Sequence, residues 1–159
     1  MKHAFTLVEL LVTIAIMSLL AVSGMASYRG YQSKTQVRDA GIMLKNEIQA
    51  VRAKALAPPI EIANKECKDY QFVIEKSSGE LNVKPLNCKP GVSFTDEMKY
   101  RLPEKVRLSS TTDIQGNFSV ENQGEYSPNN PDDPENLEIR LTDGYTPYSF
   151  TILKSGLIK

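Results

Sequence analysis

The stretch that decides the fold of this chain is Met1-Lys2-His3-Ala4, followed by Phe5-Thr6-Leu7-Val8-Glu9-Leu10-Leu11-Val12-Thr13-Ile14-Ala15-Ile16-Met17-Ser18-Leu19-Leu20-Ala21-Val22-Ser23-Gly24-Met25-Ala26. From Phe5 to Ala26 there are 22 residues, and Glu9 carries the single charge among them. At about 1.5 Å per residue, a helix of this length rises roughly 33 Å, which is enough to cross a bilayer. We therefore expect a transmembrane helix at 5–26.

The flanks of this segment predict its orientation. Lys2 and the chain amine supply firm positive charge on the N-terminal side, and positive flanks stay in the cytoplasm. The predicted location is therefore a single pass of the cytoplasmic (inner) membrane, with the later residues outside the cytoplasm.

Glu9 is the anomaly of the segment, because a carboxylate near the middle of a membrane span is disfavoured by about 2.5 to 3.5 kcal/mol. One interpretation is an acid at the edge of the span that is simply tolerated. The functional interpretation needs a cationic partner. A cut after Ala4 would create one, since the new amine of Phe5 would lie four positions before Glu9. In a bundle, Glu9 would instead neutralise the Phe5 amine of a neighbouring subunit and set the register between subunits.

These residues carry a resemblance: Lys2-His3-Ala4 followed by Phe5-Thr6-Leu7-Val8-Glu9-Leu10 resembles the prepilin leader of type IV pilins and type II secretion pseudopilins. The resemblance implies that a prepilin peptidase cuts between Ala4 and Phe5 and that the new amine of Phe5 is methylated. It also implies that Glu9 guides assembly with other pilin-like subunits, through the filament assembly machinery. The family usually has glycine before the cut, and Ala4 is small enough that we still expect processing.

The segment from 27 to 57 continues in helical period and meets no proline before Pro58. Apolar or small residues recur along it at three-to-five-residue steps, which predicts an amphipathic helix laid on a sheet. This stripe consists of Val37, Gly41, Leu44, Ile48, Val51 and Leu56, with Ala40 and Ala55 alongside. Pro58-Pro59 should end the helix, because proline lacks the amide donor and disfavours helix in the residue before it.

After Pro59 the pattern alternates, which is typical of strands. We predict strands at 70–75, 80–84, 106–110, 118–121, 137–142, 149–154 and 157–159. Ser77-Ser78-Gly79 and Lys154-Ser155-Gly156 predict tight hairpin turns. Because the longest links are broken by prolines, we expect a mainly antiparallel sheet. The predicted fold class is α+β: a leader at 1–4, a helix over 5–26 and 27–57, and a β-rich globular head at 58–159.

Two stretches of the head extend the resemblance. Leu102-Pro103-Glu104-Lys105-Val106-Arg107-Leu108 and Phe150-Thr151-Ile152-Leu153-Lys154-Ser155-Gly156-Leu157-Ile158 resemble the middle and end of H-type minor pseudopilins and related minor pilins. Both motifs are short and apolar. They favour a minor, H-type subunit among pilin-like proteins.

The head contains both cysteines of the chain, Cys67 and Cys88. Outside the cytoplasm an oxidising compartment permits a disulfide between them. Closing a loop of this size would contribute about 3 kcal/mol in the chain-entropy model. Two unpaired thiols are the alternative. We expect no metal site, because the spacing lacks paired ligands and the single histidine, His3, lies in the leader.

The loop from Glu121 to Asn136 is rich in prolines and oxygen side chains. Such a loop can hold calcium, but Pro-Asx loops are usually solvated turns. From Glu121 to Glu138 there are six acids and no base, for which a solvated face is a sufficient explanation. Tyr126, Tyr145 and Tyr148 are either a contact surface or tyrosines packed at a sheet edge.

Composition excludes several function classes. The 159 residues suit one modest domain and a membrane segment, and two independent cores are not expected. The 19 acidic and 19 basic residues balance, which argues against a dedicated nucleic-acid binder. Once the leader is removed, the chain has no histidine, so the usual serine and cysteine hydrolase sites are excluded. No glycine-rich phosphate loop follows a strand, and we expect neither an enzyme nor a cofactor.

The sequence therefore predicts a structural subunit that leaves the membrane to join a type IV pilus-like filament or a type II secretion pseudopilus. An ordinary secreted binding protein is one alternative, because Gly24-Met25-Ala26 offers small residues before a possible signal-peptidase cut. The other is a single-pass anchored domain that never polymerises. The sequence does not separate secretion from adhesion, motility or DNA uptake.

Overall fold

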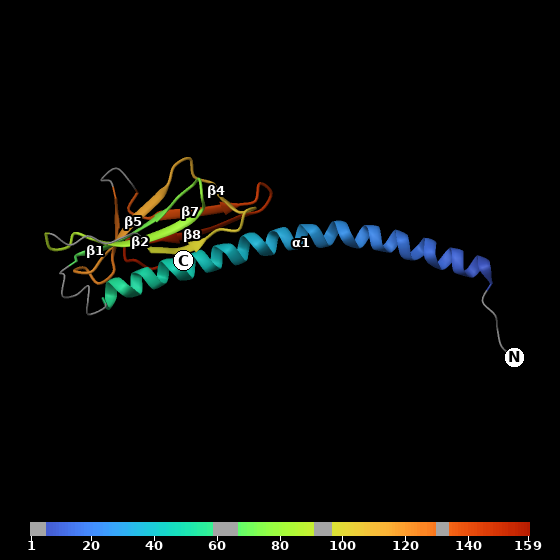
Figure 1. The fold of residues 1–159 in the computed structure, drawn as a ribbon, viewed down its shortest axis with the longest axis horizontal. Helices are drawn as coiled ribbons and strands as arrows, with labels where there is room; N and C mark the ends of the chain where they lie inside the picture. The colour runs from blue at the N-terminus through green and yellow to red at the C-terminus, as the bar shows by residue number, and fades with distance from the viewer. Residues whose placement is uncertain (1–5, 59–66, 91–96, 130–133) are drawn as a thin grey trace. The chain divides into compact units, whose positions relative to one another are not determined.

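The computed structural model describes residues 6–58, 67–90, 97–129 and 134–159, without the side chains at positions 23, 24, 26, 27, 97 and 98. In chain order the described residues form α1 (Leu7–Leu56), β1 (Asp69–Ile74), β2 (Glu80–Leu86), β3 (Glu97–Arg101), β4 (Arg107–Leu108), β5 (Ile114–Ser119), β6 (Tyr126–Pro128), β7 (Leu137–Thr142) and β8 (Pro147–Ile152) (Figure 1). The chain is α+β, as the sequence predicts.

The helix α1 runs without interruption from the apolar segment into the amphipathic one, which confirms the prediction of a single helix. It ends at Leu56 because Pro58 disfavours helical geometry in the residue before it. The last helical hydrogen bond joins the Ala57 amide to the Ala53 carbonyl at 3.0 Å.

The chain divides into two compact units, Met1–Thr35 and Gln36–Lys159, and α1 contributes residues to both. Among the helical residues that the structure describes, none form a stretch with the length and apolarity that a membrane crossing requires.

The second unit, Gln36–Lys159, contains two sheets in which every strand pair is antiparallel. The larger sheet has the order β3-β2-β1-β5-β6, and the smaller has the order β4-β7-β8. The predicted antiparallel pairing is therefore confirmed, but the strands form two sheets. The two sheets are linked at one edge, where the Tyr126 amide donates to the Lys154 carbonyl at 2.9 Å.

The core of this unit lies where α1 meets the strands. The α1 residues that are buried in it are Val37, Ala40, Leu44, Ile48, Val51 and Ala55. Strands β1 and β2 alternate, so that Tyr70, Phe72, Ile74, Leu81 and Val83 join the same cluster. The predicted stripe is correct except at Leu56, which is 52% exposed. Ala55 is buried in place of Leu56, because Ala55 lies four residues after Val51 and therefore on the same face of the helix.

The predicted strands agree with the structure where hydrophobic residues alternate strongly, as at 137–142. The strand predicted at 118–121 is wrong in position, because Ile114–Ser119 forms β5 and residues 120–124 form a turn. Gly116 interrupts the alternation there and hides the strand's first half. The strand predicted at 106–110 is shortened to Arg107–Leu108. The strand predicted at 157–159 is reduced to a bridge between Ile152 and Ile158.

Two strands of the structure, β3 and β6, were not predicted from the sequence. Strand β3 has the sequence Glu-Met-Lys-Tyr-Arg, whose charges suit the edge position that it occupies in the larger sheet. Strand β6 comprises three residues ending at Pro128, and it lies within the Pro-Asx segment that the sequence indicates to be a loop.

Candidate functional site

The first turn of α1 is closed by a reciprocal pair of side chains, Thr6 and Glu9. The Glu9 amide donates to Thr6 Oγ1 at 3.2 Å, and Glu9 Oε2 accepts from the Thr6 amide at 3.2 Å and from Thr6 Oγ1 at 3.1 Å. This is a capping box, which satisfies amides at a helix start that otherwise have no partner. The role of Thr6 was not among the sequence predictions, although the spacing Thr-x-x-Glu before an apolar run is the signal of a capping box.

The capping box fixes the Glu9 carboxylate at the beginning of the helix, where negative charge complements the helix dipole. Both hydrogen bonds from Thr6 reach the same oxygen, Oε2. An ionised carboxylate has about four acceptor positions, so Glu9 retains capacity for a cation. The predicted cleavage and methylation positions, Ala4 and Phe5, lie outside the described residues, as do the rest of the leader and His3.

From Leu7 to Met25 the helix presents large apolar side chains to solvent on every side. The exposed ones are Leu7, Val8, Leu10, Leu11, Val12, Ile14, Ile16, Met17, Leu19, Leu20, Val22 and Met25. A helix that is apolar all round requires an apolar environment on every side. The first unit therefore exposes a continuous apolar surface of the kind that marks an interaction site.

The hydroxyl groups of this segment are compatible with such burial. Thr13 Oγ1 donates to the Leu10 carbonyl at 2.9 Å. Ser18 Oγ lies 2.7 Å from the Ile14 carbonyl and 3.0 Å from the Ala15 carbonyl. Because these hydroxyls are satisfied within the helix, transfer to an apolar environment leaves neither of them without a partner.

The head is closed at one end by a disulfide between Cys67 and Cys88. Cys67 directly precedes the β1 region and Cys88 follows β2, so the bond joins the two open ends of one hairpin. Next to it Asn87 Nδ2 donates to Asp69 Oδ2 at 2.6 Å. Asn87 has a φ of 54°, a left-handed conformation that asparagine tolerates better than most residues.

Three of the six acids between Glu121 and Glu138 form local ion pairs. Ion pairs join Lys68 to Glu121 at 3.1 Å, Lys154 to Glu135 at 2.8 Å and Arg140 to Glu138 at 2.8 Å. The hydrogen bond from Arg140 is the main cause that lowers the pKa of Glu138. Residues 130–133, including Asp132 and Asp133, lie outside the described part. Among the described residues, no group of three His, Cys, Asp or Glu side chains is placed to hold a metal ion.

The three tyrosines near this loop have different roles. Tyr126 is buried and packs edge-on against Phe118, with ring centroids 6.4 Å apart. Tyr148 is half-buried and lies directly over Gly41 of α1. Tyr145 is 93% exposed. They therefore do not form a single contact surface.

The N-terminal segment is the part of the chain that matches a known family. No curated protein and no solved structure matches the chain. Residues 1–25 match the family model of the prokaryotic N-terminal methylation motif. This match includes the capping box and the whole exposed apolar segment from Leu7 to Met25. At the level of the family, it supports a type IV pilin-like protein that is processed by a prepilin peptidase and assembles with pilin-like subunits.

Proposed function

We propose that this chain is a structural subunit of a type IV pilus-like filament or of a type II secretion pseudopilus, and that it is of the H-type minor class. The observation that carries the proposal is the exposed apolar surface of Leu7–Met25, which begins at the capped carboxylate of Glu9. Supporting it is the methylation motif at residues 1–25. The H-type assignment rests on the two short resemblances at 102–108 and 150–158.

The mechanism is assembly. The segment from Phe5 to Ala26 is first held in the inner membrane as a single pass, with the head outside the cytoplasm, and this membrane stage is inferred from its sequence. After cleavage the segment moves from lipid into the filament core, so its apolar side chains stay buried throughout. Glu9 then neutralises the Phe5 amine of a neighbouring subunit, an attraction that is stronger in a core of low dielectric than in water.

We also infer that the chain has no catalytic role. Without the leader it contains no histidine, and its cysteines are joined in a disulfide, so the common nucleophile and base pairs are not available. The function then depends on shape and contacts rather than on chemistry.

The structure suggests a sharp test, because Glu9 has two separable properties. Glu9→Gln keeps a side chain that can close the capping box and removes the charge. Thr6→Ala removes the cap and keeps the charge. If charge neutralisation drives assembly, Glu9→Gln should lower incorporation into surface filaments severely, whereas Thr6→Ala should lower it only slightly. Incorporation is measured as the fraction of the chain recovered in sheared filaments. The reverse order would assign Glu9 to helix capping alone and contradict its assembly role.

The mass and N-terminal sequence of the native protein test the processing step. An N-terminus at Phe5 with one added methyl group supports the filament proposal. An N-terminus at Ser27 would instead mean a conventional secreted protein, and an intact Met1 would mean a plain membrane anchor. Either of the last two results would overturn the proposal.

A further inference from the structure

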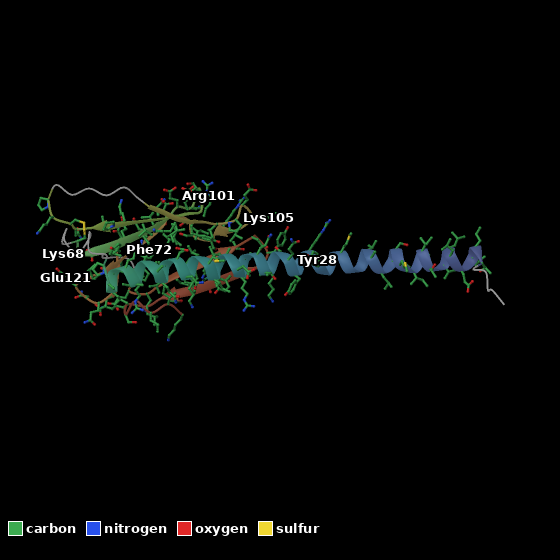
Figure 2. The ribbon with its side chains drawn as sticks, turned by 60° about the horizontal axis from the view of Figure 1, so that its bottom comes forward. Tyr28, Lys68, Phe72, Arg101, Lys105 and Glu121 are labelled. Carbon is green, nitrogen blue, oxygen red and sulfur yellow. A yellow bond between two sulfur atoms is a disulfide. The ribbon has the colours of Figure 1, made fainter. Side chains whose placement is uncertain are left out.

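Exposed tyrosines and cations follow the end of the apolar segment, within the first unit. Tyr28 and Tyr31 are 66% and 71% exposed, and Figure 2 labels Tyr28 on α1. Arg29 and Lys34 are exposed as well. A Cβ at Gly30 would meet no atom within 4 Å. The surface formed by Tyr28, Arg29, Tyr31 and Lys34, here named the 28–34 cluster, is therefore open.

The cations of the 28–34 cluster lie in a part of the sequence without acids. After Glu9 no acidic residue occurs until Asp39. Among the described residues, neither Arg29 nor Lys34 takes part in an ion pair. The cluster therefore carries two uncompensated positive charges within about three helical turns of Met25, where the apolar segment ends.

Cations of the head are placed differently, because acids accompany them. Lys68 pairs with Glu121 at 3.1 Å. A pocket of about 420 Å³ on the head is lined by Lys76 and Arg107, but also by Glu104. Surfaces that mix both signs attract an anion less than a surface of one sign does. An anionic partner is therefore favoured at the 28–34 cluster over these surfaces of the head.

The four side chains of the cluster do not form a single stripe on α1. Tyr28, Tyr31 and Lys34 follow one another at three-residue steps, which brings them to one side of the helix. Arg29 comes one position after Tyr28, about 100° round the helix, and so lies on another side. A protein partner would be met by one stripe, whereas groups on more than one side suit an environment that surrounds the helix.

The order of the side chains along α1 matches the layers of a membrane surface. Apolar side chains end at Met25, and tyrosines follow, a residue type that is enriched where lipid tails meet headgroups. From Tyr28 to Lys34 the helix rises about 9 Å, which is comparable to the thickness of one headgroup layer. Lysine and arginine lay their methylene groups along apolar surface while their charges reach the polar layer. Each such cation strengthens binding to an anionic surface about fivefold.

We propose that the 28–34 cluster binds anionic phospholipids of the phosphatidylglycerol type, with Arg29 and Lys34 on the phosphate groups and both tyrosines at the boundary between tails and headgroups. The proposal rests on the proposed function in that it concerns the membrane stage of the chain. It adds a lipid class and the residues that select this class. A phospholipid is favoured over a soluble phosphate, because the cluster continues directly from an apolar segment that lipid tails can cover.

The test measures which lipids the full-length chain retains. The chain is purified from membranes in a mild detergent and incubated with equal amounts of phosphatidylglycerol and phosphatidylcholine, and the retained lipids are counted by native mass spectrometry. The wild-type chain should prefer phosphatidylglycerol about thirtyfold at low salt, and salt at about 1 M should remove most of this preference. Arg29→Gln/Lys34→Gln should retain the two lipids almost equally. Lys105→Gln/Arg107→Gln, which neutralises two exposed cations of the head, should leave the preference unchanged.

Two kinds of result would overturn the proposal. Equal retention of both lipids by the wild-type chain, or a preference that Arg29→Gln/Lys34→Gln keeps, would show that the cluster does not select anionic lipid. Glycerol 3-phosphate in excess should not displace the lipid, because it has no tails. Displacement would mean a site for soluble phosphate and would overturn the choice of lipid.

Recovery of the wild-type chain in sheared filaments separates this proposal from the filament proposal. If the chain is recovered in filaments but shows no lipid preference, the lipid site is overturned and the filament proposal stands. If the preference is present and depends on Arg29 and Lys34, but the chain is absent from filaments, the lipid site stands and the filament proposal fails.

Discussion

Leu19 and Leu44 belong to the same helix, but Leu19 is 74% exposed and Leu44 is completely buried. The difference follows from the pattern around each residue. Near Leu44 the apolar side chains form one stripe, and the strands of the head cover that stripe. Near Leu19 they surround the helix, and no single sheet could cover them. A one-sided stripe is thus satisfied within the chain, whereas an all-round apolar surface requires other molecules.

Two glycines of α1 show the same difference between its exposed and its buried part. A Cβ at Gly30 would meet no atom within 4 Å, whereas a Cβ at Gly41 would lie 2.2 Å from the Tyr148 ring. Gly41 is therefore a packing requirement of the head, because it lets α1 approach β8 closely. Gly30 has no such role in its own unit. Each contrast along α1 separates residues that hold the head together from residues that serve contacts outside it.

The largest effect is expected from a matched pair of side-chain truncations on α1, which tests this contrast. Leu44→Ala should destabilise the head by about 2 to 5 kcal/mol, because it leaves a cavity beneath the sheets. Leu19→Ala should leave unfolding of the head unchanged and instead weaken filament incorporation. Chemical denaturation of the full-length chain in detergent, followed by the near-ultraviolet signal of the head's tyrosines, measures the first effect. Equal losses from both variants would contradict the division of α1 into these two roles.

The disulfide tests whether the head is stabilised independently of the N-terminal segment. Cys67 and Cys88 are 21 positions apart, and the double substitution to serine should cost about 3 kcal/mol by releasing the closed loop in the unfolded state. Where the head still folds, methylation of Phe5 should be normal, since processing concerns the other unit. A reduced wild-type chain should match the double variant in its denaturation midpoint. A variant that unfolds at the wild-type midpoint would refute the stabilising role.

The glycine pair gives a smaller effect and sharpens the comparison further. Gly41→Ala should destabilise the head by about 1 to 3 kcal/mol, because Tyr148 must leave its position. Gly30→Ala should stabilise α1 slightly, since alanine favours helix over glycine by about 1 kcal/mol. Thermal unfolding of both variants, followed by circular dichroism, is sufficient. Adding Tyr148→Ala should recover part of the loss in Gly41→Ala, and failure to do so would place the strain elsewhere.

Much of this architecture could be predicted from the sequence, because segments with a strong hydrophobic period keep the same secondary structure in the folded chain. The stripe from Val37 to Val51 and the strand at 137–142 are both determined by spacing alone. Strand β3 could not be predicted, because an edge strand is defined by its neighbour β2 and its own residues are mostly charged. Strand β6 is similar, since its pairing with β5 gives extended structure to a segment whose composition indicates a loop.

The candidate sites divide in the same way. Glu9 could be singled out as a candidate from the sequence, because one acid within a long apolar run is conspicuous there. The pocket lined by Lys76 and Arg107 could not be predicted, because these residues are distant in sequence and become neighbours only when the β1–β2 turn meets the segment after β3. The state of the two cysteines also required the fold, since the hairpin of β1 and β2 brings them together.

The smallest predicted effect is a gain of stability at Tyr70, a core residue that is 2% exposed. Its hydroxyl is buried without a hydrogen-bond partner among the described residues, and Tyr70→Phe should stabilise the head by about 1 kcal/mol by removing that unsatisfied group.

Burial also raises the pKa of Tyr70 above its ordinary value of 10.0. Above this value the unfolded chain loses the proton that the folded head retains, so stability falls as pH rises. The advantage of Tyr70→Phe should therefore be larger at about pH 11 than at neutral pH. Tyr145→Phe is the control, because Tyr145 is 93% exposed and has solvent around its hydroxyl in both states. A loss of stability in Tyr70→Phe at neutral pH would mean that the hydroxyl of Tyr70 is satisfied in the folded head. The contrast between an apolar core and a polar surface would then be weaker at Tyr70 than it is along α1.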